Sequence, residues 1–231
     1  MLIADIFVYR DDVQYQAKDW ENRNKIRVSK SEWAWLSVPI QAHPKGTRIT
    51  DALIDDMRDW RTKMCKSVQL SYARSDHFKT WFPRFEEIIR QGWKDQPLVT
   101  LNYALIDMFR EAWSLNRCKF VLASDLGCTG NTDIILLRMC QKLGATDYLS
   151  GAEGRNYNDP ARWAKAGINL HYHDYVYPKY RQQFGNFYFM QWMCALDLLL
   201  NRGADEGREI LEVGSLDYLA KLDKLGSMQT C

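Results

Sequence analysis

A short apolar run that leads into a glycine-bearing polar loop constrains the fold more than any other stretch of this chain. Residues 148–159 read YLSGAEGRNYND, with glycines at 151 and 154, and Asp159-Pro160 then has the pattern of a helix start. In alternating α/β proteins, ligands bind at loops that follow the strands in this way. The stretch therefore predicts a strand, a turn and a helix. The alternative is an ordinary strand-to-helix turn that contacts no ligand.

Four residues of this loop are candidate substrate contacts. Glycine lets the backbone approach a ligand closely, and a hydroxyl or a phenol in the loop is not needed to make a turn. On this basis the predicted contacts are Ser150, Gly151, Gly154 and Tyr157.

Further apolar runs read as strands and alternate with helical patterns. The runs that begin near Ile3, Trp35, Phe120, Tyr148 and Asn169 are predicted to form one mostly parallel sheet with helices on both faces. The predicted architecture is α/β, in a single domain over residues 1–231 with a helical C-terminal region over residues 204–231.

Apolar spacings of three and four residues place the helices. Thr50 is expected to cap a long helix with Leu53, Met57, Trp60, Met64 and Val68 on its core face. Other helices are expected over residues 79–91, 98–115, 133–143, 161–165 and 191–200. In the C-terminal tail an apolar stripe consists of Leu216, Leu219, Leu222 and Leu225. Asp197 lies within an apolar helix, so it is either exposed or a buried, paired carboxylate.

Charge and cysteine usage exclude several classes of protein. A net charge of +2 gives no strong attraction for nucleic acid or for an anionic membrane. No apolar run is long enough to span a bilayer, and no secretion leader is present. The six scattered cysteines form no CxxC pair, which argues against a cysteine zinc site and favours a cytoplasmic location. His171 and His173 share one strand face and could hold a metal only with a third ligand, so no metal site is predicted.

Polar side chains follow the first strand and indicate a site. Asp11 and Asp12 come at its end, and strand alternation points them in opposite directions. Asp12 is the candidate catalytic base, while Asp11 is expected to be structural. Arg23 suits a phosphate or a carboxylate. The alternative is that Asp12 and Arg23 pair with each other and tie the loop down. The candidate substrate-binding residues of this segment are Gln14, Trp20, Arg23 and Asn24.

Three residues from later segments complete the predicted site. Lys63 could add a second positive charge and is the other candidate catalytic residue. Asn102 lies beside the apolar face of a helix, and Ser124 follows a strand. Because parallel strands present their C-terminal ends together, Asp12, Ser124 and the loop from Ser150 to Tyr157 are expected to converge.

Several segments, in their order along the chain, resemble the WbqC-like bacterial proteins. They read ADIFVYRDDVQY, WENRNKI, WLSVPI, DWRTK, LGATDYLSGAEGRNY, AGINL and LDLLLNRG, and the resemblance runs from Ala4 to about Gly203. It implies a cytoplasmic enzyme of surface-polysaccharide (O-antigen) or small-molecule biosynthesis. The implied activity is transfer of an acyl or aminoacyl group to an amino-sugar or related precursor, with a small-molecule or nucleotide-linked sugar as substrate. No cofactor is identified.

Two departures from the family pattern affect this interpretation. Members begin with a segment containing His-Gln-Pro and Pro-Trp, and this chain starts after it, which predicts an open sheet edge beside residues 3–8 and favours a homo-oligomer. Members also often carry histidine where this chain has Met64. Two alternatives therefore stay open. One is a non-catalytic binding or scaffold protein of the same pathway. The other is a metal-dependent hydrolase that uses Asp11, Asp12, His171 and His173.

Overall fold

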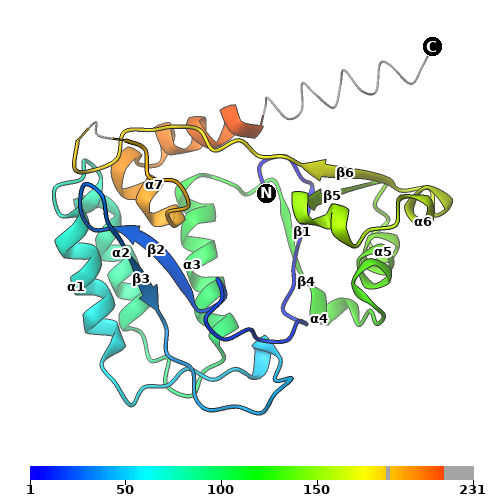
Figure 1. Ribbon diagram of the computed structural model, residues 1–231, viewed down its shortest axis with the longest axis horizontal. Helices are drawn as coiled ribbons and strands as arrows, with labels where there is room; N and C mark the ends of the chain where they lie inside the picture. Colours follow the sequence, from blue (N-terminus) through cyan, green and yellow to red (C-terminus); the bar gives the residue numbers. More distant parts are fainter. Residues whose placement is uncertain (186–187, 216–231) are drawn as a thin grey trace. The chain divides into compact units, whose positions relative to one another are not determined.

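A computed structural model describes residues 1–185 and 188–215 of the chain (Figure 1). The chain forms two compact units. The first unit takes Met1–Arg10, Arg117–Tyr177 and the chain from Glu212 onwards, and the second takes Asp11–Asn116 and Pro178–Leu211. Each unit has a hydrophobic core of its own. The prediction of one domain over the whole chain stays a prediction.

Two parallel strand pairs and short helices make up the first unit. Strand β1 (Ile6–Tyr9) pairs with β4 (Lys119–Leu122), and β5 (Asp147–Gly151) pairs with β6 (Asn169–His173). The helices are α4 (Ala123–Leu126), α5 (Thr132–Lys142), the 3-10 helix η2 (Ala152–Asn156) and α6 (Pro160–Lys165). Side-chain caps set two of the starts, because Asn131 accepts from the Ile134 amide and Asp159 from the Ala161 amide, each at 3.1 Å.

The prediction of one mostly parallel sheet is wrong, because β4 and β5 belong to separate strand pairs. Helix α5 has apolar side chains on two faces and packs beside both strand pairs. Leu137 and Cys140 pack with Trp163 beside β5 and β6, whereas Met139 packs with Ala123 beside β1 and β4. Strand-like and helix-like runs in alternation therefore gave the correct element types but not the sheet. Within the described residues β1 has β4 as its one strand partner, and the open edge stays a prediction.

A β-hairpin packed on helices makes up the second unit (Figure 1). Strand β2 (Arg23–Arg27) pairs antiparallel with β3 (Trp33–Ser37). The sequence pattern predicted β3 but not β2, because charged residues alternate along β2. The helices are η1 (Ile49–Asp51), α1 (Trp60–Tyr72), α2 (Phe78–Arg90), α3 (Leu98–Ala112) and α7 (Ala195–Arg202). Buried Ile26 and Leu36 attach the hairpin to the core that these helices share.

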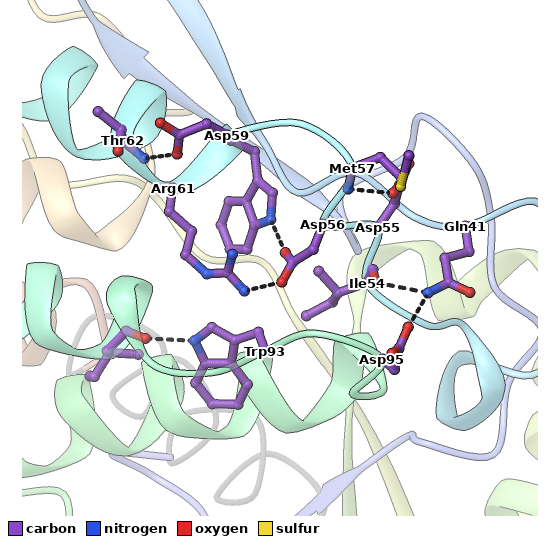
Figure 2. A network of polar contacts seen from close by, with 12 residues as sticks. Gln41, Ile54, Asp55, Asp56, Met57, Asp59, Arg61, Thr62, Trp93 and Asp95 are labelled. Carbon is purple, nitrogen blue, oxygen red and sulfur yellow. Dashed lines mark hydrogen bonds and ion pairs between the residues drawn. The ribbon is translucent and has the colours of Figure 1, made fainter.

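The helix predicted to be capped by Thr50 begins nine residues later than expected, at Trp60 with Asp59 as its cap. Aspartate side chains prevent a helix before Trp60, because they accept hydrogen bonds from backbone N–H groups. Asp55 accepts from the Met57 amide at 2.9 Å, and Asp59 caps α1 by accepting from the Thr62 amide at 3.1 Å (Figure 2). Met57, expected in the core, is 91% exposed.

The other predicted helices are confirmed, with α7 starting at Ala195 rather than near 191. Residues 205–215 are also helical. The stripe of Leu216, Leu219, Leu222 and Leu225 lies outside the described residues. None of the helices in the described ranges has the length and apolar character needed to cross a membrane.

Candidate functional site

One face of the β2–β3 hairpin carries alternating cations and indole rings. Lys25 is directly opposite Trp35, and Arg27 is opposite Trp33. Residues that face each other across an antiparallel pair point to the same side, and so do residues two apart on one strand. Arg23 therefore shares this face as well. The opposite side of the hairpin holds the buried core residues.

At the open end of this face, three tryptophans surround two cations. We call Trp20, Arg23, Lys25, Trp33 and Trp35 the aromatic platform. The Lys25 ammonium lies 4.3 Å from the ring centroid of Trp33, 5.2 Å from that of Trp35 and 5.3 Å from that of Trp20. The Arg23 guanidinium lies 4.1 Å above Trp35, and its Nε–H has no hydrogen-bond partner among the described residues. Trp20 is 52% exposed and Trp33 44% exposed, so indole surface is available beside the half-buried cation of Arg23.

Glu21 is a carboxyl beside the platform that the sequence pattern did not single out. Burial raises its pKa, and the Gln16 amide, which donates to Glu21 Oε2 at 2.9 Å, opposes that rise. Burial, and next the charge of Glu21, raise the pKa of Tyr15. Asn102 donates its Nδ2–H to the Glu21 carbonyl at 3.1 Å and so holds this segment to α3. A carboxyl with a raised pKa beside an open surface is a candidate acid or base. In the sequence, the position of Glu21 between Trp20 and Arg23 was the feature that could have identified it as a candidate.

The predicted residues before the platform differ in their burial. Asp11 is buried and accepts from the Tyr103 hydroxyl at 3.1 Å, as expected for a structural carboxylate. Asp12 is half-buried, and Gln14 is exposed and forms a backbone bridge with Arg48. Asp12 and Gln14 belong to the same unit as the platform, and their roles stay predictions.

Strand alternation separates Asn24 from Arg23. Because the two residues are neighbours on β2, their side chains point to opposite faces. The exposed Asn24 side chain accepts from the Lys25 amide at 2.8 Å. Arg23, and not Asn24, therefore shares the face on which a ligand would contact the aromatic platform.

The segment before and at the start of α1 forms a polar network around Asp56 (Figure 2). Asp56 accepts from Trp60 Nε1 at 2.9 Å and from Arg61 at 2.6 Å. Burial alone would raise the pKa of Asp56, but these hydrogen bonds lower it below its ordinary value. Lys63 is exposed on the next turn. Met64, where family members often carry histidine, is buried in the core and acts here as a packing residue.

The glycine loop of the first unit is tightly packed on itself. Ser150 is 2% exposed; its hydroxyl donates to the Gly151 carbonyl at 3.2 Å and accepts from Asn158 Nδ2 at 3.3 Å. A Cβ at Gly154 would lie 2.0 Å from Ser150 Oγ, so only glycine fits there. Tyr157 is 44% exposed. Loop packing accounts for Ser150 and Gly154, and a ligand contact from the loop stays a prediction.

The predicted site residues are divided between the two units. Asp12, Gln14, Trp20, Arg23, Asn24, Lys63 and Asn102 lie in the second unit, and Ser124, Ser150, Gly151, Gly154 and Tyr157 lie in the first. Their convergence stays a prediction. The four residues considered for a metal hydrolase are divided in the same way. His171 Nε2 lies 2.8 Å from Asp147 Oδ1. The described part of the chain has no group of three or more His, Cys, Asp or Glu side chains placed to hold a metal ion.

At the other end of the hairpin face, Arg27 belongs to a buried polar network. We call Arg27, Tyr72, Tyr180, Gln182 and Asp197 the buried network. Asp197 is 0% exposed and accepts from the hydroxyls of Tyr72 and Tyr180, each at 2.7 Å, and from Gln182 at 2.9 Å. The paired, buried alternative for Asp197 is therefore confirmed. Burial raises the pKa of Asp197 despite these donors.

Gln182 links the two charges of the buried network. Its Oε1 accepts from Arg27 at 3.1 Å while its Nε2 donates to Asp197. Arg27 is 0% exposed and also donates to the carbonyls of Ser29, Lys30 and Tyr188. Burial, and then Asp197, raise the pKa of the nearby Cys194 to about 12. A charged network with this many internal hydrogen bonds holds the second unit together.

Comparison with known proteins places the chain in a family without giving it an activity. The chain is 29% identical over 204 residues to the uncharacterized protein Rv1507c of Mycobacterium tuberculosis (strain ATCC 25618 / H37Rv), which covers 87% of this chain and 86% of that protein. No solved structure matches the chain. The family model of the WbqC-like proteins matches residues 1–209, and the chain therefore belongs to the WbqC-like protein family.

Proposed function

We propose that the protein is a biosynthetic transferase that moves an acyl or aminoacyl group onto the amine of an amino-sugar or a related precursor. The observation that carries this proposal is the aromatic platform. A sugar ring has apolar faces and a polar edge, and it needs a flat apolar surface beside a few polar groups. Trp20 and Trp33 supply exposed indole surface, and Arg23 supplies a cationic donor next to it. Membership of the WbqC-like family also supports a role in biosynthesis.

The reaction needs a base and a cation near the bound ring. Attack of the amine on the acyl carbon forms a C–N bond, breaks the bond between that carbon and its leaving group, and releases a proton from the nitrogen. Asp12 and Glu21 are the candidate carboxylates to take that proton. Burial raises the pKa of Glu21, which suits this carboxylate to accept a proton. Arg23 would hold the phosphate of a nucleotide-linked sugar, with Lys63 as the candidate second cation.

Titration with UDP-glucosamine, followed by calorimetry, tests the binding part of the proposal. Stacking on an aromatic ring contributes about 1–3 kcal/mol, so Trp20→Ala and Trp33→Ala should each weaken binding about tenfold or more. Leu70→Ala is the matched control, since Leu70 is an 83% exposed apolar side chain on α1 outside the platform. Unchanged affinity in both tryptophan variants would remove the platform from the proposal.

Mass spectrometry of the reaction mixture tests the transfer part. Wild-type protein is incubated with UDP-glucosamine and a panel of acyl-coenzyme A and aminoacyl-adenylate donors. A mass gain equal to the donor group, lost in Glu21→Gln or Asp12→Asn at an unchanged melting temperature, is the expected result. Binding with no mass gain across the panel would instead favour the non-catalytic scaffold of the same pathway.

A further inference from the structure

A pocket of about 150 Å³ in the second unit is lined by an unusual concentration of arginines. It lies where the residues after α1 meet residues 181–185 and the end of α7. Arg74, Arg181 and Arg202 line it, and Asp76 is its one carboxylate. We propose that this pocket, called the arginine pocket, binds the phosphoryl group of a small molecule. This inference does not rest on the proposed transfer reaction or on the aromatic platform.

The arginines have donors to spare. Among the described residues, neither Arg74 nor Arg181 forms a hydrogen bond or an ion pair. Arg202 pairs with Glu206 through one Nη, but its buried Nε–H has no partner within the described ranges. The unused guanidinium donors of Arg74 and Arg181 are therefore the ones that can bind an oxyanion in the pocket.

The uncharged polar side chains that line the pocket are already hydrogen-bonded to one another or to neighbouring residues. Asn201 donates to Gln183 Oε1 and accepts from the Gln183 amide, both at 2.8 Å. Ser75 also donates to Asn201 at 3.2 Å, and Gln182 is committed to the buried network. The arginines are therefore the lining residues that supply free hydrogen-bond donors to a ligand. Phe184, at the rim, has a φ of 71°, a strained conformation of the kind found at ligand clamps.

The charge balance favours a phosphoryl dianion over a carboxylate. Three guanidinium groups line the pocket against the carboxylate of Asp76, and Glu206 pairs with Arg202 from outside the lining, so positive charge is still in excess by one. A guanidinium donates two parallel hydrogen bonds to neighbouring phosphate oxygens, and several can share one phosphoryl group. The volume admits a phosphoryl group together with a small part of the molecule that carries it. Free phosphate and a phosphomonoester present the same chemistry to the arginines.

Calorimetry on the full chain at low ionic strength tests the arginine pocket with three probes: inorganic phosphate, glucose 6-phosphate and acetate. Saturable binding of both phosphates, tighter than that of acetate, is expected. Losing one charge-assisted contact should weaken binding about tenfold, so Arg74→Gln and Arg181→Gln should each show that loss. Asp76→Asn, which removes the one negative charge, should tighten binding. Tighter binding of glucose 6-phosphate than of phosphate would assign the site to a phosphorylated small molecule, and equal affinities would assign it to the free ion.

Arg84→Gln is the matched control, because Arg84 is a 44% exposed arginine on α2 outside the pocket. Its affinity for phosphate should equal that of the wild type. The melting temperature without phosphate should be the same for Arg74→Gln, Arg181→Gln and the control. The proposal is overturned if no probe saturates, if acetate binds as tightly as phosphate, or if the control loses as much affinity as the pocket variants.

Discussion

The two ends of strand β2 use the same residue type in opposite ways. Arg23 and Arg27 lie on one face of one strand, four residues apart, and both contact aromatic rings. Arg27 is 0% exposed, with backbone carbonyls and Gln182 as acceptors. Arg23 lies over Trp35 at an open surface, with its Nε–H unpartnered among the described residues. The Arg27 end of the strand is buried and hydrogen-bonded, whereas the Arg23 end lies beside exposed indole surface.

The difference comes from a distant part of the chain rather than from the strand. Gln182 and Tyr188 accept hydrogen bonds from Arg27 and belong to the segment that begins at Pro178, more than 150 residues later. Asp197, which Gln182 links to Arg27, comes from the same segment. A buried charge is tolerated when its hydrogen bonds are complete and a partner charge is near, and this segment supplies both. The described residues supply no such cover for Trp20 and Trp33. Cover from a distant segment thus separates the structural cation Arg27 from Arg23, whose role in binding is a proposal.

The largest expected effect is on Arg27. Removing one member of a buried charged network costs about 3–5 kcal/mol, because the remaining groups stay buried without partners. Arg27→Gln should therefore lower the urea midpoint strongly, whereas Arg23→Gln should change the free energy of unfolding by less than about 1 kcal/mol. Circular dichroism during urea unfolding measures both. Equal losses in the two variants would mean that the two ends of the strand do not differ as described.

Tyr72 should give the next largest effect. Its hydroxyl donates to Asp197 at 2.7 Å and accepts from the Arg27 amide at 3.1 Å. Tyr72→Phe leaves a buried carboxylate short of a donor and should cost about 1–3 kcal/mol. Tyr188→Phe is the control, because it keeps the carbonyl and the ring that contact Arg27 and removes only the hydroxyl of a 51% exposed side chain. It should remain within about 0.5 kcal/mol of wild type in the same unfolding experiment.

Asp197 should give stability a pH dependence with a defined sign. Its pKa in the folded protein is raised above 3.8, so between 3.8 and the folded value the folded state binds more protons than the unfolded chain. The stabilisation is fully present below 3.8 and is lost as pH rises through the folded pKa. The free energy of unfolding of wild type, minus that of Asp197→Asn, should therefore fall as pH rises. Urea midpoints across the acid-to-neutral range measure it.

Asp56 provides a control of opposite sign. Its pKa is lowered below 3.8, so its stabilisation is present above 3.8 and is lost as pH falls through the folded value. The wild-type advantage over Asp56→Asn should grow as pH rises, by a modest amount because Arg61 and Asp56 are partly exposed. If the wild-type advantage over Asp197→Asn instead grew as pH rises, the hydrogen bonds from the tyrosines would outweigh the cost of burying the carboxylate.

Local patterns predicted the elements well and their assembly poorly. The caps Asn131 and Asp159 and the apolar spacing of α3 are local, and the helices that they mark are confirmed. The prediction of a single sheet is wrong because β4 and β5 belong to separate strand pairs, and local spacing does not determine which strands pair. The late start of α1 follows from competition by Asp55 and Asp59 for backbone donors. The sequence alone does not show which aspartate side chains accept from backbone N–H groups.

Site residues were harder to predict, because their roles depend on partners far away in the chain. Trp20 and Arg23 were identified by residue type, and the structure places them together on the platform. Lys25, Trp33 and Glu21 were missed because β2 was not predicted, so the cross-strand neighbours could not be paired. Nothing local marks Arg27 as buried or Arg74 as part of a pocket, since both depend on the segment beyond Pro178.

The smallest expected effect belongs to Lys25, and it sharpens the comparison most closely. Its ammonium lies 4.3 Å from the Trp33 centroid at an exposed site, where a cation–π contact contributes about 0.5–1 kcal/mol. A double-mutant cycle with Lys25→Gln and Trp33→Leu should return a coupling of that size. A coupling above about 2 kcal/mol would be typical of a desolvated pair and would make the platform a structural element like the Arg27 end. A weak coupling is what a binding surface requires, because a ligand ring can then displace the ammonium from an indole face at little cost to the fold.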